Sequence, residues 1–125
     1  MPTEKLEPHI PILATESAPW SVASLKRLFT EYQMSNVSFV DNAYKTIHKG
    51  RFEKYSLILI SDILEKGESL KVLSQIRSEG KNKQIPIIFM YQDGDKETAE
   101  KAVASGASAT VKKPVEERTL REAIE

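Results

Sequence analysis

Residues 56–69 read SLILISDILEKGES, and this stretch decides the fold. The run SLILI at residues 56–60 is apolar at nearly every position, which is typical of a central parallel strand that is buried on both faces. Polar residues and a turn follow, beginning with Ser61 and Asp62. Open α/β sheets place their chemistry beyond the carboxyl ends of their strands. Residues 61 and 62 are therefore the first candidates for a functional site.

Strand-like and helix-like patterns alternate on both sides of this stretch. Short apolar runs predict further strands at residues 9–14, 36–40, 85–91 and 108–111. Apolar residues at helical spacing predict helices at residues 17–32, 41–52, 70–79, 95–105 and 116–125. Five β–α units in strict alternation predict an α/β domain, in which a parallel sheet carries helices on both faces and the crossovers are right-handed.

Cap and turn residues predict where the helices begin and end. Ser17 is a candidate N-cap for the first helix, and Ser69 is one for the third. Gly50 is expected to end the second helix, whose Tyr44 and Ile47 are expected to point into the core.

The composition is that of an ordinary globular domain. The chain has 18 basic and 18 acidic side chains, and this net charge of zero gives no argument for binding nucleic acid or an anionic membrane. Cysteine is absent, and His9 and His48 lie in no motif, so we expect no disulfide, no metal site and no histidine-based triad. The N-terminus lacks the apolar core of a signal peptide and every apolar run is strand-sized, which favours a cytoplasmic protein without membrane contact.

The chain is expected to form one domain. Residues 1–8 are polar with two prolines and are predicted to be a flexible lead, followed by the domain at residues 9–125. The last predicted helix stops at Glu125 after about three turns. A domain trimmed from a longer protein and a short natural tail are both compatible with this ending.

The second half of the sequence resembles a response-regulator receiver domain. The resemblance is carried by QIPIIFMY at residues 84–91 and by EKAVASGASATVKKPV at residues 100–115. The family shows a proline-led apolar strand, a helix ending in Gly-Ala, and a short strand closed by Lys-Pro. The similarity extends from about Ile10 to Glu125 and runs without a gap against the single-domain chemotaxis receiver. It implies a flavodoxin-like three-layer sandwich whose five parallel strands have the order 2-1-3-4-5.

The resemblance also assigns positions around a phosphorylation pocket. Receivers hold Mg²⁺ with two acids after the first strand, and Glu16 and Ser17 stand at those two positions. Tyr91 stands where the family has a Thr or Ser that contacts the phosphoryl group. Lys113 matches the lysine that offsets the phosphoryl charge, and Pro114 matches the proline after it, often preceded by a cis peptide bond.

The aspartate that accepts the phosphoryl group falls on Ser61. Counting from the third strand and counting back from the third helix both lead to Ser61, whereas Asp62 requires one inserted and one deleted residue. Because side chains alternate between the faces of a strand, a slip of one residue would also turn the strand over. Asp62 is then most simply a solvated loop acid, and it remains the alternative phosphoacceptor.

These replacements predict a pocket depleted for phosphorylation. A serine cannot form the mixed anhydride of an acyl phosphate, and Glu16 alone should hold Mg²⁺ poorly because hard cations need several oxygen ligands. Tyr91 is too bulky to act like a mobile threonine, and Thr110 stands where the family has its aromatic switch. In the simpler interpretation, Tyr91 fills the vacated space, while Lys113 is either paired with Glu16 or solvated.

The function expected on this basis is that of a pseudo-receiver, which is a signalling module and not an enzyme. It would act through a protein partner on the face formed by residues 95–105, 108–111 and 116–125, and the partner would be a histidine kinase or a covalently linked output domain. No cofactor is expected. The alternatives are a working receiver that is phosphorylated at Asp62 with Mg²⁺, and a flavodoxin-like cofactor binder, although ATESAPW at residues 14–20 has no glycine for a phosphate-binding loop.

Overall fold

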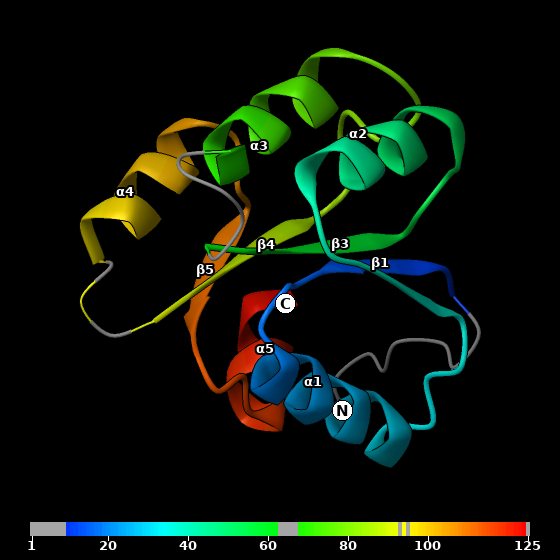
Figure 1. Cartoon of the computed structure of the whole chain (residues 1–125), viewed down its shortest axis with the longest axis vertical. Coiled ribbons are helices and arrows are strands. Elements are labelled where there is room, and N and C mark those ends of the chain that lie inside the picture. Colours follow the sequence, from blue (N-terminus) through cyan, green and yellow to red (C-terminus); the bar gives the residue numbers. More distant parts are fainter. Residues whose placement is uncertain (1–9, 63–67, 93, 95, 125) are drawn as a thin grey trace.

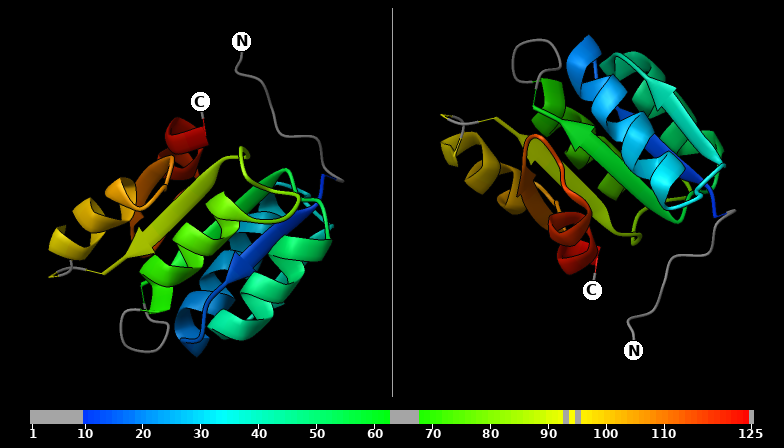
Figure 2. Two further views of the ribbon diagram at one scale, coloured as in Figure 1. Left: turned by 90° about the horizontal axis from the view of Figure 1, so that it is seen from above. Right: turned by 90° about the horizontal axis from the view of Figure 1, so that it is seen from below.

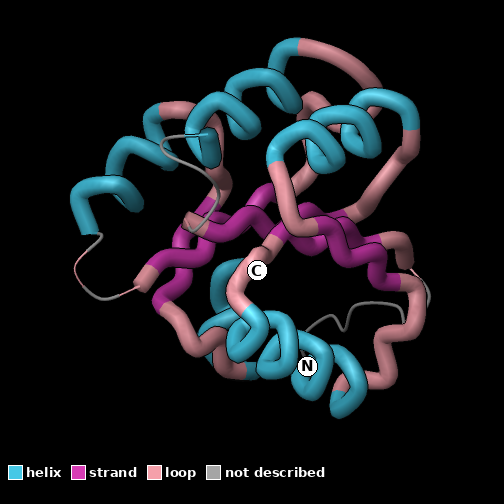
Figure 3. The backbone as a smooth tube through the Cα atoms, in the orientation of Figure 1, coloured by secondary structure: helices cyan, strands magenta, loops and turns pink. Residues whose placement is uncertain are grey.

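The computed structural model describes residues 10–62, 68–92, 94 and 96–124, so the predicted flexible lead at residues 1–8 lies outside the described residues. Strands and helices alternate as β1 (Ile12–Thr15), α1 (Pro19–Glu31), β2 (Val37–Val40), α2 (Ala43–Phe52), β3 (Leu57–Ser61), α3 (Glu68–Ser78), β4 (Ile87–Tyr91), α4 (Lys96–Ala104), β5 (Ala109–Lys112) and α5 (Glu117–Ile124). This order confirms the predicted β–α units (Figure 3). Within the described residues, no helix is both long and apolar enough to cross a lipid bilayer.

The five strands form one parallel sheet with the order β2-β1-β3-β4-β5, which confirms the predicted flavodoxin-like topology. In register, Ile60 lies between Thr15 of β1 and Phe89 of β4, and Ser61 lies opposite Met90. The arrowheads in Figure 2 point toward one edge of the sheet, where the carboxyl ends of all the strands meet.

Helices cover both faces of the sheet. Figure 1 shows α1 and α5 on one face and α2, α3 and α4 on the other. The strand β3 is buried along its whole length, as its apolar composition predicts. Its alternate residues separate the two layers of the core, because Ile58 and Ile60 pack under α2 and α3 while Leu57 and Leu59 pack under α1 and α5.

The structure corrects the predicted start of the first helix. Ala18, and not Ser17, is the N-cap residue of α1, and its side chain makes no capping hydrogen bond. Pro19 occupies the first turn, where its missing N–H leaves no hydrogen bond unmade. In α2, by contrast, the Asn42 side chain accepts a hydrogen bond from the backbone N–H of Lys45 at 2.8 Å.

The second helix differs from the prediction in two ways. Tyr44 is 77% exposed and does not point into the core, whereas Ile47 is partly buried against it. Gly50 does not end the helix, which continues to Phe52. A Cβ atom at Gly50 would lie 3.3 Å from the Ile76 side chain of α3, so the glycine permits α2 and α3 to pack closely.

Candidate functional site

Four polar side chains come together at the carboxyl edge of the sheet. Glu16 follows β1, Ser61 ends β3, Asp62 is the next residue, and Lys113 follows β5. The parallel strands impose this meeting, because β3 lies directly between β1 and β4 and the strands all end at the same edge. Backbone hydrogen bonds to β4 hold Asp62 and Lys113 in place. The N–H of Asp62 donates to the carbonyl oxygen of Met90 at 2.9 Å, and the N–H of Lys113 donates to the carbonyl oxygen of Tyr91 at 2.7 Å.

The ammonium group of Lys113 is the centre of this cluster. Its Nζ atom lies 2.9 Å from Oε1 of Glu16 and 3.0 Å from Oδ1 of Asp62. It also donates a hydrogen bond of 2.6 Å to the Ser61 hydroxyl. The Lys113 and Glu16 side chains are 0% exposed and that of Asp62 is 1% exposed, so these ion pairs are buried. In such an environment a lost partner leaves an uncompensated buried charge.

Glu16 is held on every side by hydrogen-bond donors. Five donors contact its two oxygens. They are the backbone N–H groups of Ser17 (2.9 Å) and Ala18 (3.1 Å), the hydroxyls of Ser21 (2.7 Å) and Ser61 (3.0 Å), and the Lys113 ammonium (2.9 Å). An ionised carboxylate offers about four lone-pair sites. The carboxylate is therefore saturated by the protein's own donors.

Asp62 is not the solvated loop acid of the simpler interpretation. Its carboxylate turns into the cluster, with Oδ1 on Lys113 and with Oδ2 accepting the backbone N–H of Gln92 at 2.9 Å. Ser61 and Asp62 both reach the ammonium, although alternation along a strand should separate them. The reason is that Ser61 is the last residue of β3, so Asp62 lies beyond the extended backbone to which the alternation applies.

The other predicted residues lie around this cluster. Ser17 is exposed and contributes its backbone N–H to Glu16. Tyr91 is partly buried and packs against the core beneath α2, α3 and α4. Thr110 is partly buried on β5, opposite Phe89 of β4. The peptide bond between Lys113 and Pro114 is cis.

Three contributors to the site were missed by sequence reasoning. Ser21 is 3% exposed, and its hydroxyl anchors Glu16 from α1. The sequence signal for Ser21 was its position four residues before the buried Leu25, because residues at this spacing lie on the same face of a helix. Ser69 does not cap its helix, which begins at Glu68, and its hydroxyl donates to the carbonyl of Ser61 at 2.6 Å. The backbone N–H of Gln92 carries no side-chain signal and could not be found in this way.

The residues of the cluster do not fit a divalent metal ion. Among the described residues there is no group of three or more histidine, cysteine, aspartate or glutamate side chains that could hold one. Mg²⁺ prefers a near-octahedral set of oxygen ligands that are free to approach it. Here Glu16 is saturated, and an ammonium group already lies between the two carboxylates.

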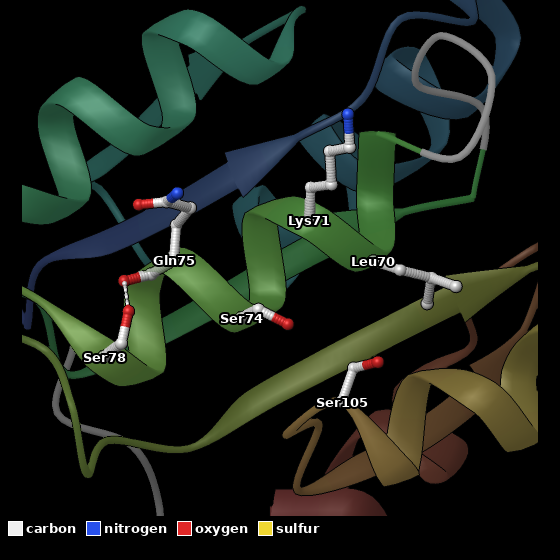
Figure 4. Close-up of a pocket in the computed structure, with 6 residues that line it drawn as sticks. All are labelled: Leu70, Lys71, Ser74, Gln75, Ser78 and Ser105. Carbon is white, nitrogen blue, oxygen red and sulfur yellow. Dashed lines mark hydrogen bonds between the residues drawn. The ribbon is translucent and has the colours of Figure 1, made fainter.

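A shallow groove of about 310 Å³ lies apart from this cluster, along α3. It is lined by Leu70, Lys71, Ser74, Gln75, Ser78 and Ser105. Figure 4 shows Ser105, just after α4, on the side of the groove opposite Ser74. None of the residues that line it belongs to the buried cluster around Lys113, so the groove adds nothing to that site.

Several solved structures that are similar to this chain are response regulators or receiver domains. The sequence is similar to a response regulator from Hahella chejuensis, with 28% identity, a TM-score of 0.75, and coverage of 83% of this chain and 80% of that one. The bacteriophytochrome response regulator RtBRR is 24% identical, with a TM-score of 0.78 and coverage of 92% of this chain and 75% of that one. The receiver domain of the sensor histidine kinase PA1611 from Pseudomonas aeruginosa PAO1, whose structure has a magnesium ion in the active site cleft, is 18% identical, with a TM-score of 0.80 and coverage of 93% and 94% of the two chains.

The match to the family itself covers almost the whole domain. The model of the response regulator receiver domain matches residues 12–125, which begin at β1 and include Glu16, Ser61, Asp62 and Lys113. Together with the strand order, this match shows that the chain belongs to the response regulator receiver domain family.

Proposed function

We propose that this receiver domain signals through contacts with a protein partner and without metal-dependent phosphorylation, because the ammonium of Lys113 occupies the pocket between Glu16 and Asp62. The observation that carries the proposal is the buried cluster in which Lys113 pairs with both Glu16 and Asp62. In this cluster the ammonium already offsets the negative charge of the two carboxylates. The domain is thus a signalling module and not an enzyme.

The cost of opening this cluster supports the proposal. A metal ion that used Glu16 would have to displace at least one of its donors, and it would enter beside an ammonium group of like charge. Breaking a buried ion pair by removing one partner typically costs about 3–5 kcal/mol. The hydroxyl of Ser61 cannot replace a carboxylate as the acceptor, because it forms no mixed anhydride with phosphate.

The partner is expected on the face formed by α4, β5 and α5. The exposed side of α4 presents charges of both signs around Val103, which is 53% exposed. Such a mixture of an apolar centre and a charged rim suits a protein interface. A histidine kinase and a covalently linked output domain are the two partners that the family membership suggests, and both imply a cytoplasmic location.

A second candidate function is phosphorylation at Asp62, and one observation favours it. The Asp62 carboxylate lies 3.0 Å from the Lys113 ammonium and accepts the backbone N–H of Gln92. Two donors placed in this way could also stabilise the oxygens of a phosphoryl group on Asp62. In that reaction the carboxylate oxygen would attack phosphorus, and the donor's bond to phosphorus would break.

Mass spectrometry of the intact protein separates the two functions. The chain is incubated with acetyl phosphate and Mg²⁺, alongside the variants Asp62→Asn and Ser61→Ala and the control Asp41→Asn, whose side chain is exposed. We expect no phosphoryl adduct on any of the four proteins. A labile adduct that is absent only from Asp62→Asn would overturn the proposal and establish the second function.

A further inference from the structure

The helix α2 carries a row of exposed aromatic rings. Tyr44, His48 and Phe52 lie four residues apart, so they fall on one side of the helix. Tyr44 and His48 stack with ring centroids 6.1 Å apart, and His48 and Phe52 follow at 5.0 Å. Tyr44 is 77% exposed and Phe52 is 56% exposed. We call these three residues the α2 ring row.

The ring row is not needed to pack the helix. Ala43, Thr46 and Gly50 are the buried residues of α2, and Ile47 packs partly against the core. The small side chains bring the helix close to its neighbours, and the large ones point to solvent, which reverses the usual pattern of an amphipathic helix. In Figure 1, α2 lies at one end of its layer, with α3 beside it and α4 at the other end, so no further helix of that layer lies beyond it on that side. Exposed aromatic residues gathered in this way are typical of binding sites.

The charge of α2 is one-sided. The helix contains Lys45, Lys49 and Arg51 and no acidic residue, although the whole chain has a net charge of zero. Each of these bases pairs with a carboxylate outside the helix, on Asp41, Glu53 and Glu79. The paired side chains are between 34% and 65% exposed, and such exposed pairs contribute only about 0–1 kcal/mol. An acidic partner can therefore replace these carboxylates at little cost.

We propose that α2 is a second docking surface, which binds an acidic segment of a protein partner. Apolar side chains of the segment cover the ring row, and its carboxylates pair with Lys45, Lys49 and Arg51. The row extends about 12 Å along the helix, which is a length suited to a short helical segment. This surface belongs to α2 and is separate from the face of α4, β5 and α5, and the inference does not depend on the chemistry of the pocket.

The charge pattern disfavours the two other occupants. A second copy of this chain, paired through a two-fold axis, would bring the same bases and the carboxylates that already pair with them, and so would add no new opposite charge. A nucleic acid carries a negative charge on every nucleotide, so its backbone would approach Asp41, Glu53 and Glu79 as closely as the bases. A protein segment can place its carboxylates only opposite the bases.

The test uses two synthetic helical peptides. Both carry leucine at the same positions, and the polar positions are glutamate in one peptide and lysine in the other. Each is titrated into the isotopically labelled chain, and amide chemical shifts are followed by NMR. We expect the glutamate peptide to shift amides of residues 43–53 and the lysine peptide to shift none of them. The variant Tyr44→Ala/Phe52→Ala should bind the glutamate peptide at least tenfold more weakly. The control Trp20→Ala/Val103→Ala removes two other exposed apolar side chains and should bind within twofold of the native chain.

Charge reversal provides the second arm. The variant Lys45→Glu/Lys49→Glu should lose the glutamate peptide and gain the lysine peptide, whereas Lys71→Glu/Lys101→Glu, on α3 and α4, should behave as the native chain does. Shifts that map to another face, or no shifts at all, overturn the inference. Two further results would also overturn it. One is binding of oligothymidylate to α2 that is as strong as that of the glutamate peptide or stronger. The other is a dimer, detected by sedimentation, that the variant Tyr44→Ala/Phe52→Ala abolishes.

Discussion

The side chain of Lys113 links three segments that are distant in sequence. One ammonium offsets two buried carboxylates, from Glu16 after β1 and Asp62 after β3, and it is also bonded to Ser61. The two carboxylates outnumber the ammonium, and the hydroxyls of Ser21 and Ser61 and the backbone N–H groups of Ser17 and Ala18 supply the remaining polar contacts to Glu16. Buried charges persist only when they are paired and hydrogen-bonded in this way. The cluster is therefore sensitive to the loss of its single cation.

Replacement of Lys113 by methionine should destabilise the domain strongly. The variant keeps most of the apolar stem but leaves Glu16 and Asp62 buried without a cation, which we expect to cost about 3–5 kcal/mol of unfolding free energy. Urea denaturation measures the loss, with Lys101→Met on the exposed surface of α4 as the control. Adding Glu16→Gln to Lys113→Met should restore part of the stability. If it restores none, the loss reflects packing and not charge.

Tyr55 should make the stability of the domain depend on pH in the alkaline range. Burial, followed by its hydrogen bond to Glu53 at 2.7 Å, raises the pKa of Tyr55 above its ordinary value of 10.0, while that hydrogen bond holds the pKa of Glu53 below its usual range. The folded state thus keeps the phenolic proton to a higher pH than the unfolded state does. Stability from this group is complete below the unfolded pKa and is lost as the pH rises above it.

The variant Tyr55→Phe tests this dependence, because phenylalanine does not titrate. At about pH 7 we expect the variant to be less stable by about 0.5–1.5 kcal/mol, owing to the missing hydrogen bond. At about pH 11 this difference should narrow, because only the native chain loses stability through the phenol. Urea denaturation at both pH values measures the two differences, and a difference that does not change between them would contradict the assignment.

At the scale of the elements, the packing of α2 against the turn after α3 depends on Gly80. This residue has a φ of +88°, and a Cβ atom on it would lie 2.7 Å from the backbone Cα of Arg51. Gly94 has a similar φ of +95°, but a Cβ atom there would meet nothing within 4 Å. A side chain at either glycine would therefore strain the backbone, but only a side chain at Gly80 would also collide with the backbone of Arg51.

Alanine at each glycine separates these two effects. Gly94→Ala should cost on the order of 1–2 kcal/mol from the left-handed backbone alone. Gly80→Ala should cost about 1–3 kcal/mol more, because the backbone of Arg51 must move away. Thermal or urea unfolding of the two variants gives the comparison. Equal losses would show that the approach of α2 to this turn is not tight.

Sequence reasoning predicted the elements well because period and alternation are local properties of the chain. The buried run at β3 and the alternation of strands and helices led to the correct sheet order, together with the resemblance to receivers. It placed Tyr44 wrongly because the periodicity of α2 is ambiguous: either its aromatic residues or its small residues could face the core. The glycine at position 50 favours the small face, since it permits close contact with Ile76.

At the scale of the whole molecule, the site was predicted only in part. The segments that meet at the sheet edge follow from the topology, whereas Glu16, Ser61 and Lys113 were named from the resemblance to receiver domains. The direction of the Asp62 side chain depends on β3 ending at Ser61, and the sequence does not define the end of a strand to the residue. The anchoring of Glu16 by Ser21 depends on how α1 is rotated, and that rotation is set by packing and not by local sequence.

The whole domain should be indifferent to Mg²⁺, and two substitutions should change this. Ser17→Asp adds a second carboxylate beside Glu16, and Ser21→Ala removes the hydroxyl that occupies Oε1. A ligand that binds only the folded state adds RT ln(1 + [L]/Kd), so ~10 mM Mg²⁺ should stabilise the double variant by ~1.4 kcal/mol if its Kd is ~1 mM. Thermal unfolding with Mg²⁺ and then with excess chelator measures the effect.

The native chain and the control Ser17→Ala/Ser21→Ala should show no shift in the unfolding midpoint under the same conditions. The control loses the same hydroxyls but gains no carboxylate, so a shift confined to the aspartate variant would identify the missing acid as the reason why the metal is not held. A midpoint that rises with Mg²⁺ in the native chain would mean that Lys113 yields its place to the ion. The closed pocket would then be one state of a working receiver and not a fixed property of this domain.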